Sequence, residues 1–147
     1  MLKPMTIRHY PALQALWQSI KAFSINSIDD SREGIAAFLT RNPKTSVVCE
    51  QNGEIIGSIL CGHDGRRGYF YHVCVSEDSR MQGIGKAMVD YCIEALKKEN
   101  ITKVSLLTFT HNRLGNTFWE KLGFTKRNDI NLYDYLLNPE NETTINQ

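Results

Sequence analysis

Residues 73–88 read V-C-V-S-E-D-S-R-M-Q-G-I-G-K-A-M and join a strand-like apolar run to an amphipathic helix through a glycine-containing turn. In this turn, Gly83 and Gly85 lack the side chains that would keep a ligand away from the backbone. The first N–H groups of a helix have no partner inside it and lie at the positive end of its dipole, so they attract anions. We therefore expect the turn to hold a pyrophosphate group.

Two common phosphate-binding patterns do not match this turn. A dinucleotide-binding G-x-G-x-x-G motif would need a third glycine three positions after Gly85, where the chain has methionine. A P-loop needs four residues between its glycines and Ser or Thr after its lysine, whereas one residue separates Gly83 from Gly85 and alanine follows Lys86. The remaining pattern, Arg/Gln-x-x-Gly-x-Gly/Ala at a helix start, resembles the acyl-CoA signature of the GCN5-related N-acetyltransferases (GNAT), matched here by Arg80, Gly83 and Gly85.

Residues 112–124 carry a second likeness to that family. They read N-R-L-G-N-T-F-W-E-K-L-G-F, in which Asn112 can cap a helix and Gly123 can end it. The closing aromatic-Glu-Lys-Leu-Gly-Phe phrase is similar to the family's second hallmark, and the two hallmarks lie about 30 residues apart, the size of a βαβ unit. The resemblance extends over residues 5–137, and residues 62–68 further resemble small uncharacterised bacterial single-domain members.

The pattern of elements predicts an α/β (α+β) fold. It follows the order β-α-α-β-β-β-α-β-α-β-β and, as in GNAT proteins, would form a mixed, mainly antiparallel central sheet flanked by helices. Asn52-Gly53 is the strongest hairpin signal, because both residues tolerate the positive φ of a type I′ turn. The other expected features are a first strand over residues 5–9, a loop over 23–29, a second helix that starts at Asp30, and closing strands over 124–127 and 132–136.

Length and composition limit the function. The chain has 147 residues, of which 41% are apolar, enough for one packed core. We expect residues 1–137 to form a single N-acetyltransferase domain and the polar residues 138–147 to be a disordered tail. The 17 basic and 16 acidic residues nearly cancel, so nucleic acid is not an expected partner. With no apolar run of membrane-spanning length and no signal-peptide core, we expect a cytoplasmic protein without membrane contact.

The four cysteines indicate neither a metal site nor a disulfide framework. Cys49, Cys61, Cys74 and Cys92 have no C-x-x-C spacing and no accompanying histidine cluster. We expect them to be reduced, buried and small apolar in character, and we expect no metal. The resemblance places the strand that contains Cys74 beside the thioester.

The resemblance implies how acetyl-CoA, the expected co-substrate, is held. Backbone amides of the turn would bind the pyrophosphate, with charge-assisted contacts from Arg80 or Lys86. The strand that includes residues 73–75 would pair with the pantetheine amides. Asn112 matches a family position that touches the pantetheine arm, and a plain helix cap is an equal alternative. The expected cofactor-binding residues are Val73, Val75, Arg80, Gln82, Gly83, Ile84, Gly85, Lys86 and Asn112.

The usual catalytic groups of the family are absent at their expected positions. Many relatives have a tyrosine, which donates a proton to the sulfur, where this chain has Trp119; an indole N–H cannot release a proton. Water or another tyrosine would then protonate the thiolate, and Trp119 has the alternative role of a packed helix aromatic. Relatives often use a glutamate near the strand that spans residues 69–73 here. His72 could relay a proton in its place, although a lone strand histidine is more often a structural, hydrogen-bonded residue.

Tyr69 and Tyr71 alternate onto one face of that strand. We expect this face to line the acceptor pocket, with Tyr69 as a further candidate for a catalytic group. Asp64 and Arg67 could meet an acidic or zwitterionic acceptor, and the alternative is that they are solvated charges beside the hairpin turn Asp64-Gly65.

The resemblance therefore implies an acetyl-CoA-dependent N-acetyltransferase that acts on a primary amine, of a small molecule, by direct attack on the thioester. One alternative is an acyl-CoA-binding sensor with decayed catalysis. Another is an acetyltransferase of a protein N-terminus or of aminoacyl-tRNA, of which the near-zero net charge disfavours the RNA substrate. A homodimer is compatible with the sequence, which does not specify the oligomeric state.

Overall fold

The computed structural model describes residues 1–147 of the chain. Its main sheet contains β1 (Leu2–Pro4), β3 (Val47–Gln51), β4 (Glu54–His63), β5 (Gly68–Val75) and β6 (Val104–Ser105). These strands lie in the order β1-β3-β4-β5-β6, and all neighbours are antiparallel except the parallel pair β5 and β6. A separate small sheet pairs β2 (Ser24–Asn26) with β7 (Thr143–Ile145).

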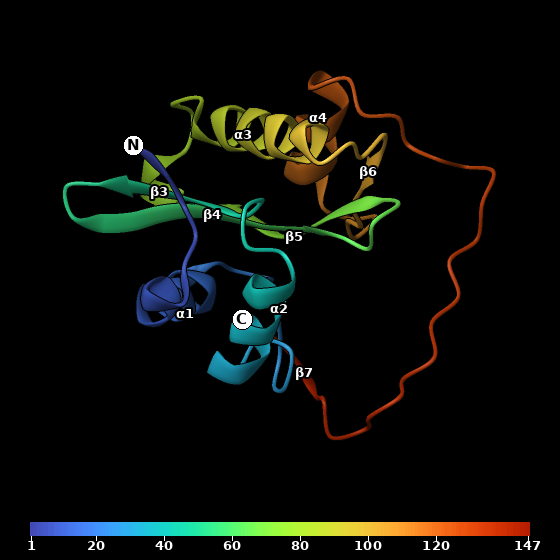
Figure 1. The fold of residues 1–147 in the computed structure, drawn as a ribbon, viewed down its shortest axis with the longest axis horizontal. Helices are drawn as coiled ribbons and strands as arrows, with labels where there is room; N and C mark the ends of the chain where they lie inside the picture. Colours follow the sequence, from blue (N-terminus) through green and yellow to red (C-terminus); the bar gives the residue numbers. More distant parts are fainter.

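Helices cover both faces of the main sheet (Figure 1). Helices α1 (Tyr10–Ser19) and α2 (Arg32–Arg41) lie on one face, and α3 (Ile84–Lys98) and α4 (Arg113–Lys121) lie on the other. Two short 3₁₀ helices, η1 (Ile7–His9) and η2 (Glu77–Ser79), precede α1 and α3. This arrangement confirms the predicted α/β class with a mainly antiparallel central sheet. No helix combines the length and the apolar character that crossing a bilayer requires.

Side chains that alternate along the strands form two apolar clusters, one on each face of the sheet. Val47 of β3 belongs to the cluster under α3, and the next residue, Val48, belongs to the cluster under α1; both are fully buried. Trp17 of α1 fills the second cluster and Met88 of α3 fills the first. Burial on both faces fixes β4 and β5 between the two helical layers.

Two local expectations are met. Asn52 and Gly53 have φ values of 53° and 79°, and the strands that they join, β3 and β4, are antiparallel, as the hairpin signal predicts. All four cysteines are free and buried.

The N-terminal part differs from the prediction in two places. Residues 5–9 do not form the first strand, which is β1; the Thr6 N–H donates to His9 Nδ1 at 3.0 Å and closes a turn that becomes η1. The second helix is capped by Ser31 rather than Asp30, because Ser31 Oγ accepts the Gly34 N–H at 3.0 Å. Asp30 is buried and serves another purpose, described below.

The C-terminal part also differs. The predicted closing strands over residues 124–127 and 132–136 are absent, and the segment expected to be a disordered tail contains β7, which pairs with β2 inside the predicted loop 23–29. Asn146 anchors this pairing, since its Nδ2 donates to the carbonyls of Trp17 and Ile20 at 2.8 and 2.7 Å. Because β7 lies on the α1 side and α4 on the other, the connecting chain runs extended around the sheet (Figure 1), and residues such as Leu132 stay exposed.

Candidate functional site

The turn between η2 and α3 has the geometry of an anion cradle. Gly83 is the N-cap of α3, with a left-handed φ of 75°, and its helix start has no side-chain cap. The first intrahelical bond runs from the Ala87 N–H to the Gly83 carbonyl, so the three preceding N–H groups, of residues 84–86, have no helical acceptor. Residues 80–83 are exposed. A ligand can therefore reach this group of free donors from solvent.

Two basic side chains flank the cradle. Arg80 donates from Nε to the carbonyl oxygen of Val75 at 3.2 Å, which ties the turn to the end of β5. Lys86 forms an exposed pair with Asp90 one helical turn away, at 2.7 Å. Such a solvated pair contributes little to stability, so Lys86 is free to exchange partners with an anion.

Gly85 and Asn112 have structural roles that are visible in the fold. A Cβ atom on Gly85 would lie 3.0 Å from the ring of Phe118, so glycine lets α4 pack against the start of α3. Asn112 caps α4, because its Oδ1 accepts the Gly115 N–H at 3.0 Å. The cap interpretation of Asn112 thus has a contact to support it, and the contact with pantetheine stays a prediction.

The end of β5 has a free edge. On one side, β5 pairs with β4 as far as Val75, but on the other it pairs with β6 only at Gly68 and Tyr69. Beyond Tyr69, β5 has no strand paired with it on this side. The backbone of Val73 and Val75 can therefore pair with an extended ligand on that side, and this edge leads directly to the cradle at α3.

A β-bulge interrupts β5 at His72. The pairing register moves from Cys74 opposite Ser58 to Tyr71 opposite Leu60, which leaves two residues of β5 facing one of β4. His72 has a φ of 50°, rare for a residue with a side chain. As a result, the adjacent residues Tyr71 and His72 both contact the α1–α2 layer. Tyr71 contacts Phe38 of α2, and His72 contacts Trp17 of α1.

His72 is held tightly on this face. Its ring centroid lies 4.8 Å from those of both Trp17 and Phe23, and its Nε2 lies 2.7 Å from Asp30 Oδ1. Asp30 itself is buried.

Tyr69 and Tyr71 lie side by side, as their alternation predicts, with ring centroids 4.6 Å apart. Tyr71 is 48% exposed. The Phe38 ring packs edge-on against the Tyr71 ring, with 6.0 Å between the ring centroids. Burial raises the pKa of Tyr69 to about 12, with smaller contributions from Tyr71 and Asp134. Tyr69 therefore stays protonated at neutral pH and can donate a hydrogen bond.

Trp119 and Cys74 are buried. Trp119 packs among Phe70, Phe118 and Phe124, with ring centroids 6.0, 4.9 and 4.8 Å away. Burial raises the pKa of the Cys74 thiol to about 12, so it is not a thiolate nucleophile at neutral pH.

Asp64 and Arg67 lie apart from these groups. Asp64 Oδ1 accepts the N–H groups of Arg66 and Arg67 at 2.8 and 2.9 Å and closes the β4–β5 hairpin. Those backbone bonds are the main reason that the pKa of Asp64 is lowered. Four strand residues span about 13 Å between Arg67 and Tyr71. The structure therefore does not bring Asp64 and Arg67 together with Tyr71 and His72.

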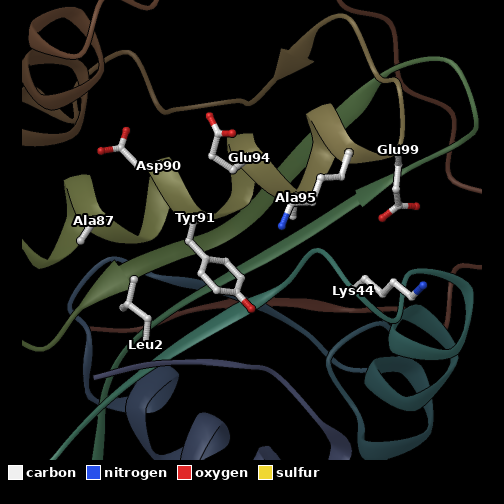
Figure 2. Close-up of a pocket in the computed structure, with 9 residues that line it drawn as sticks. Leu2, Lys44, Ala87, Asp90, Tyr91, Glu94, Ala95 and Glu99 are labelled. Atoms are coloured by element: carbon white, nitrogen blue, oxygen red, sulfur yellow. The ribbon is translucent and has the colours of Figure 1, made fainter.

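A hollow of about 700 Å³ lies elsewhere, along α3 beside the β1 edge (Figure 2). Its lining residues are Leu2, Lys44, Ala87, Asp90, Tyr91, Glu94, Ala95, Lys98 and Glu99. None of these belongs to the predicted site. All three of its carboxylates already have partners: Asp90 pairs with Lys86, Glu94 with Lys97 and Glu99 with His63. We therefore place the candidate site at the cradle and the β5 edge, which carry the relevant chemistry.

The surroundings of His72 could not be derived from the sequence. The sequence pattern predicts Asp30 only as the start of a helix and Trp17 only as an apolar position of a helix. One signal is present: the run Asp29-Asp30-Ser31 offers three capping side chains where one helix needs one. A surplus carboxylate beside the true cap has to find another role.

Comparison with known proteins agrees with this geometry. Residues 10–124 match the model of the Acetyltransferase (GNAT) family. The chain is 30% identical over 115 residues to an acetyltransferase of Pectobacterium atrosepticum. The aligned region covers 78% of this chain and 80% of that protein.

Two solved structures have a similar fold. One is the PaiA N-acetyltransferase from Thermoplasma acidophilum in complex with coenzyme A, with a TM-score of 0.75, 14% identity and coverage of 88% of this chain and 92% of that one. The other is the ribosomal-protein-S18-alanine N-acetyltransferase from Escherichia coli, with a TM-score of 0.71, 19% identity and coverage of 86% and 78%. Together with the family match, these likenesses show that the chain belongs to the GNAT family of acetyltransferases, as its two motifs predict.

Proposed function

We propose that this acetyltransferase transfers an acetyl group from acetyl-CoA to the primary amine of a small molecule, by direct attack of the amine on the thioester. The observation that carries the proposal is the continuous path from the free amides at the start of α3 to the open edge of β5. A solved structural neighbour binds coenzyme A, which supports the same ligand here.

In this proposal each part of the path holds one part of the cofactor. The amides of residues 82–86 hold the pyrophosphate, assisted by Arg80 or Lys86. The backbone of Val73 and Val75 pairs with the pantetheine amides. Asn112 lies at the start of α4 and remains a candidate for a contact with the pantetheine arm.

The acceptor amine would lie on the other side of β5, against Tyr69, Tyr71 and His72. The bulge supports this placement because it turns His72 to the same face as the two tyrosines. The aromatic face suits a small organic amine, and the near-zero net charge offers little attraction to RNA.

A screen of amines with thiol release as the readout tests the function. The panel contains amino acids, aliphatic diamines and polyamines, and peptides with a free N-terminal alanine, since one structural neighbour acts on a ribosomal-protein alanine. We expect thiol release with one or more small amines. Activity on peptides alone would overturn the small-molecule proposal, and acetyl-CoA binding without any turnover would favour the sensor alternative.

Arg80→Ala is expected to weaken acetyl-CoA binding by about 1–3 kcal/mol, that is, about 5- to 150-fold, if its contact with the cofactor is charge-assisted. Calorimetric titration measures this change. Arg66→Ala, at the exposed tip of the β4–β5 hairpin, is the matched control and should bind like the parent. Equal affinities of the two variants would remove Arg80 from the cofactor site.

Trp119→Tyr is expected to lower the melting temperature without raising kcat. The reason is that Trp119 is only 8% exposed and fills an aromatic cluster, so a smaller ring loses contacts. The measurement is kcat and melting temperature on the same preparation. A clear rise in kcat would instead show that thiolate protonation limits turnover and that a tyrosine is useful at this position.

A further inference from the structure

The His72 imidazole has one defined partner and one free nitrogen. Its Nε2 lies 2.7 Å from Asp30 Oδ1, across 42 positions of the chain. No partner within the protein is present for Nδ1. Since every fully buried polar side-chain atom of the molecule has a hydrogen-bond partner, Nδ1 reaches the surface. With the Nε2–H donated to a carboxylate, Nδ1 keeps its lone pair and can accept a proton.

Asp30 is itself fixed from several directions. Its side chain is 6% exposed, and its Oδ2 accepts the Asn26 N–H at 2.7 Å. The Asp30 N–H donates to the Asn26 carbonyl at 2.9 Å, and its own carbonyl accepts the Tyr10 hydroxyl at 2.7 Å. A carboxylate is rarely buried in this way without a specific partner, because losing water is costly. The helix that follows does not use it, since Ser31 is the cap.

We propose that Asp30 is a positioning residue that holds His72 in the Nε2–H form, so that Nδ1 can take a proton from the acceptor amine, directly or through one water. This inference rests on the proposed acetyltransferase function. It assigns to a bulged histidine and a buried aspartate the part that a glutamate plays in many relatives.

The proton and bond changes balance. Nδ1 removes one proton from the acceptor ammonium, which leaves a neutral amine. The amine nitrogen forms a bond to the thioester carbon as the carbon–sulfur bond breaks, and the thiolate leaves. The second nitrogen proton passes to the thiolate through water, and the imidazolium returns its proton to solvent.

Other titratable groups lie on the elements that pack around the ring. They are Tyr10 of α1, Asp29 in the preceding loop, Arg32, Glu33 and Arg41 of α2, and Tyr69, Tyr71 and Cys74 of β5. Burial raises the pKa of Tyr10, Tyr71 and Cys74, so these three are uncharged at neutral pH. None of these groups is bonded to a ring nitrogen of His72, whereas Asp30 is.

The test compares Asp30→Asn with Asp29→Asn, a neighbouring change of the same charge whose side chain is exposed and bonded to Asn141 instead. With the amine found in the screen, we expect Asp30→Asn to lower kcat/KM for the amine at least tenfold at pH 7 and to leave acetyl-CoA affinity unchanged. An amide can donate as well as accept, so it no longer specifies the tautomer. Asp29→Asn should keep the parental kcat/KM.

A double variant separates positioning from a structural role. In a His72→Gln background, Asp30→Asn should cause no further loss of kcat/KM, because the residue it acts through is gone. An equal loss in both backgrounds, or a parental kcat/KM in Asp30→Asn, would overturn the proposal.

The ¹⁵N NMR signals of His72 in the parent protein give a readout without turnover, and they serve even if Asp30→Asn does not fold. We expect the Nε2–H tautomer, and the Nδ1–H tautomer would overturn the proposal. A parent that releases no thiol with any amine would reject the proposed function and the role of Asp30 with it. A turning-over parent with an unaffected Asp30→Asn variant would reject the role of Asp30 alone.

Discussion

Gly83→Val is expected to weaken acetyl-CoA binding at least 100-fold, about 3 kcal/mol, while the protein stays folded. Gly83 has a left-handed φ of 75°, and a Cβ atom there would meet nothing of the chain within 4 Å. The added side chain would therefore project into the open space that a pyrophosphate has to enter. It would also disfavour the backbone conformation that presents the free amides of α3. Calorimetric titration with acetyl-CoA measures the loss.

Gly53→Val is the matched control for this prediction. Gly53 has a φ of 79° and equally open surroundings, but it lies in the β3–β4 hairpin. Both variants should lose about 1–3 kcal/mol of stability to backbone strain. Only Gly83→Val should lose cofactor binding. If both variants bind acetyl-CoA like the parent, the assignment of the cradle is wrong.

Trp119→Ala is expected to lower the free energy of unfolding by about 3–5 kcal/mol, the usual cost of removing a buried large aromatic side chain. Trp119 is 8% exposed and contacts the rings of Phe70, Phe118 and Phe124. Its loss would open a cavity between α4 and β5. Urea denaturation measures the change, and the melting temperature should fall by roughly 10 °C or more.

Leu114→Ala on the same helix is the control for the truncation. Leu114 is 77% exposed, so its truncation should change stability by no more than about 0.5 kcal/mol. A Trp119→Ala variant as stable as Leu114→Ala would mean that the aromatic cluster does not hold α4 on the sheet.

The parts of the site that could be predicted are those that depend on neighbours in the sequence. The turn from Arg80 to Gly85 and the hairpin at Asn52-Gly53 follow from glycine spacing and turn chemistry, which act over a few residues. The same holds for the helix after Gly83, whose apolar face follows the 3.6-residue period. Asn112 and Gly115 likewise form their cap within one turn.

The register of β5 could not be predicted. A strand alternates with period two, so the sequence places Tyr69 and Tyr71 on one face and His72 on the other. The bulge adds one residue and reverses this for His72. Pairing with β4 and the packing of Trp17 and Phe23 around the ring accompany this reversal, and these contacts join segments far apart in the chain.

By itself, the sequence determined the glycine turn that precedes α3, the order of the central elements and the family, because these depend on short motifs of neighbouring residues. Tertiary structure alone decided that Asp30 faces His72 rather than capping α2, that the pairing of β5 with β6 ends at Tyr69, and that β7 pairs with β2. Each depends on contacts between segments distant in the sequence, such as the bond from Asn146 to Trp17 across 129 positions. Local propensity cannot encode such contacts, because their free energy appears only when the sheet and both helical layers have assembled.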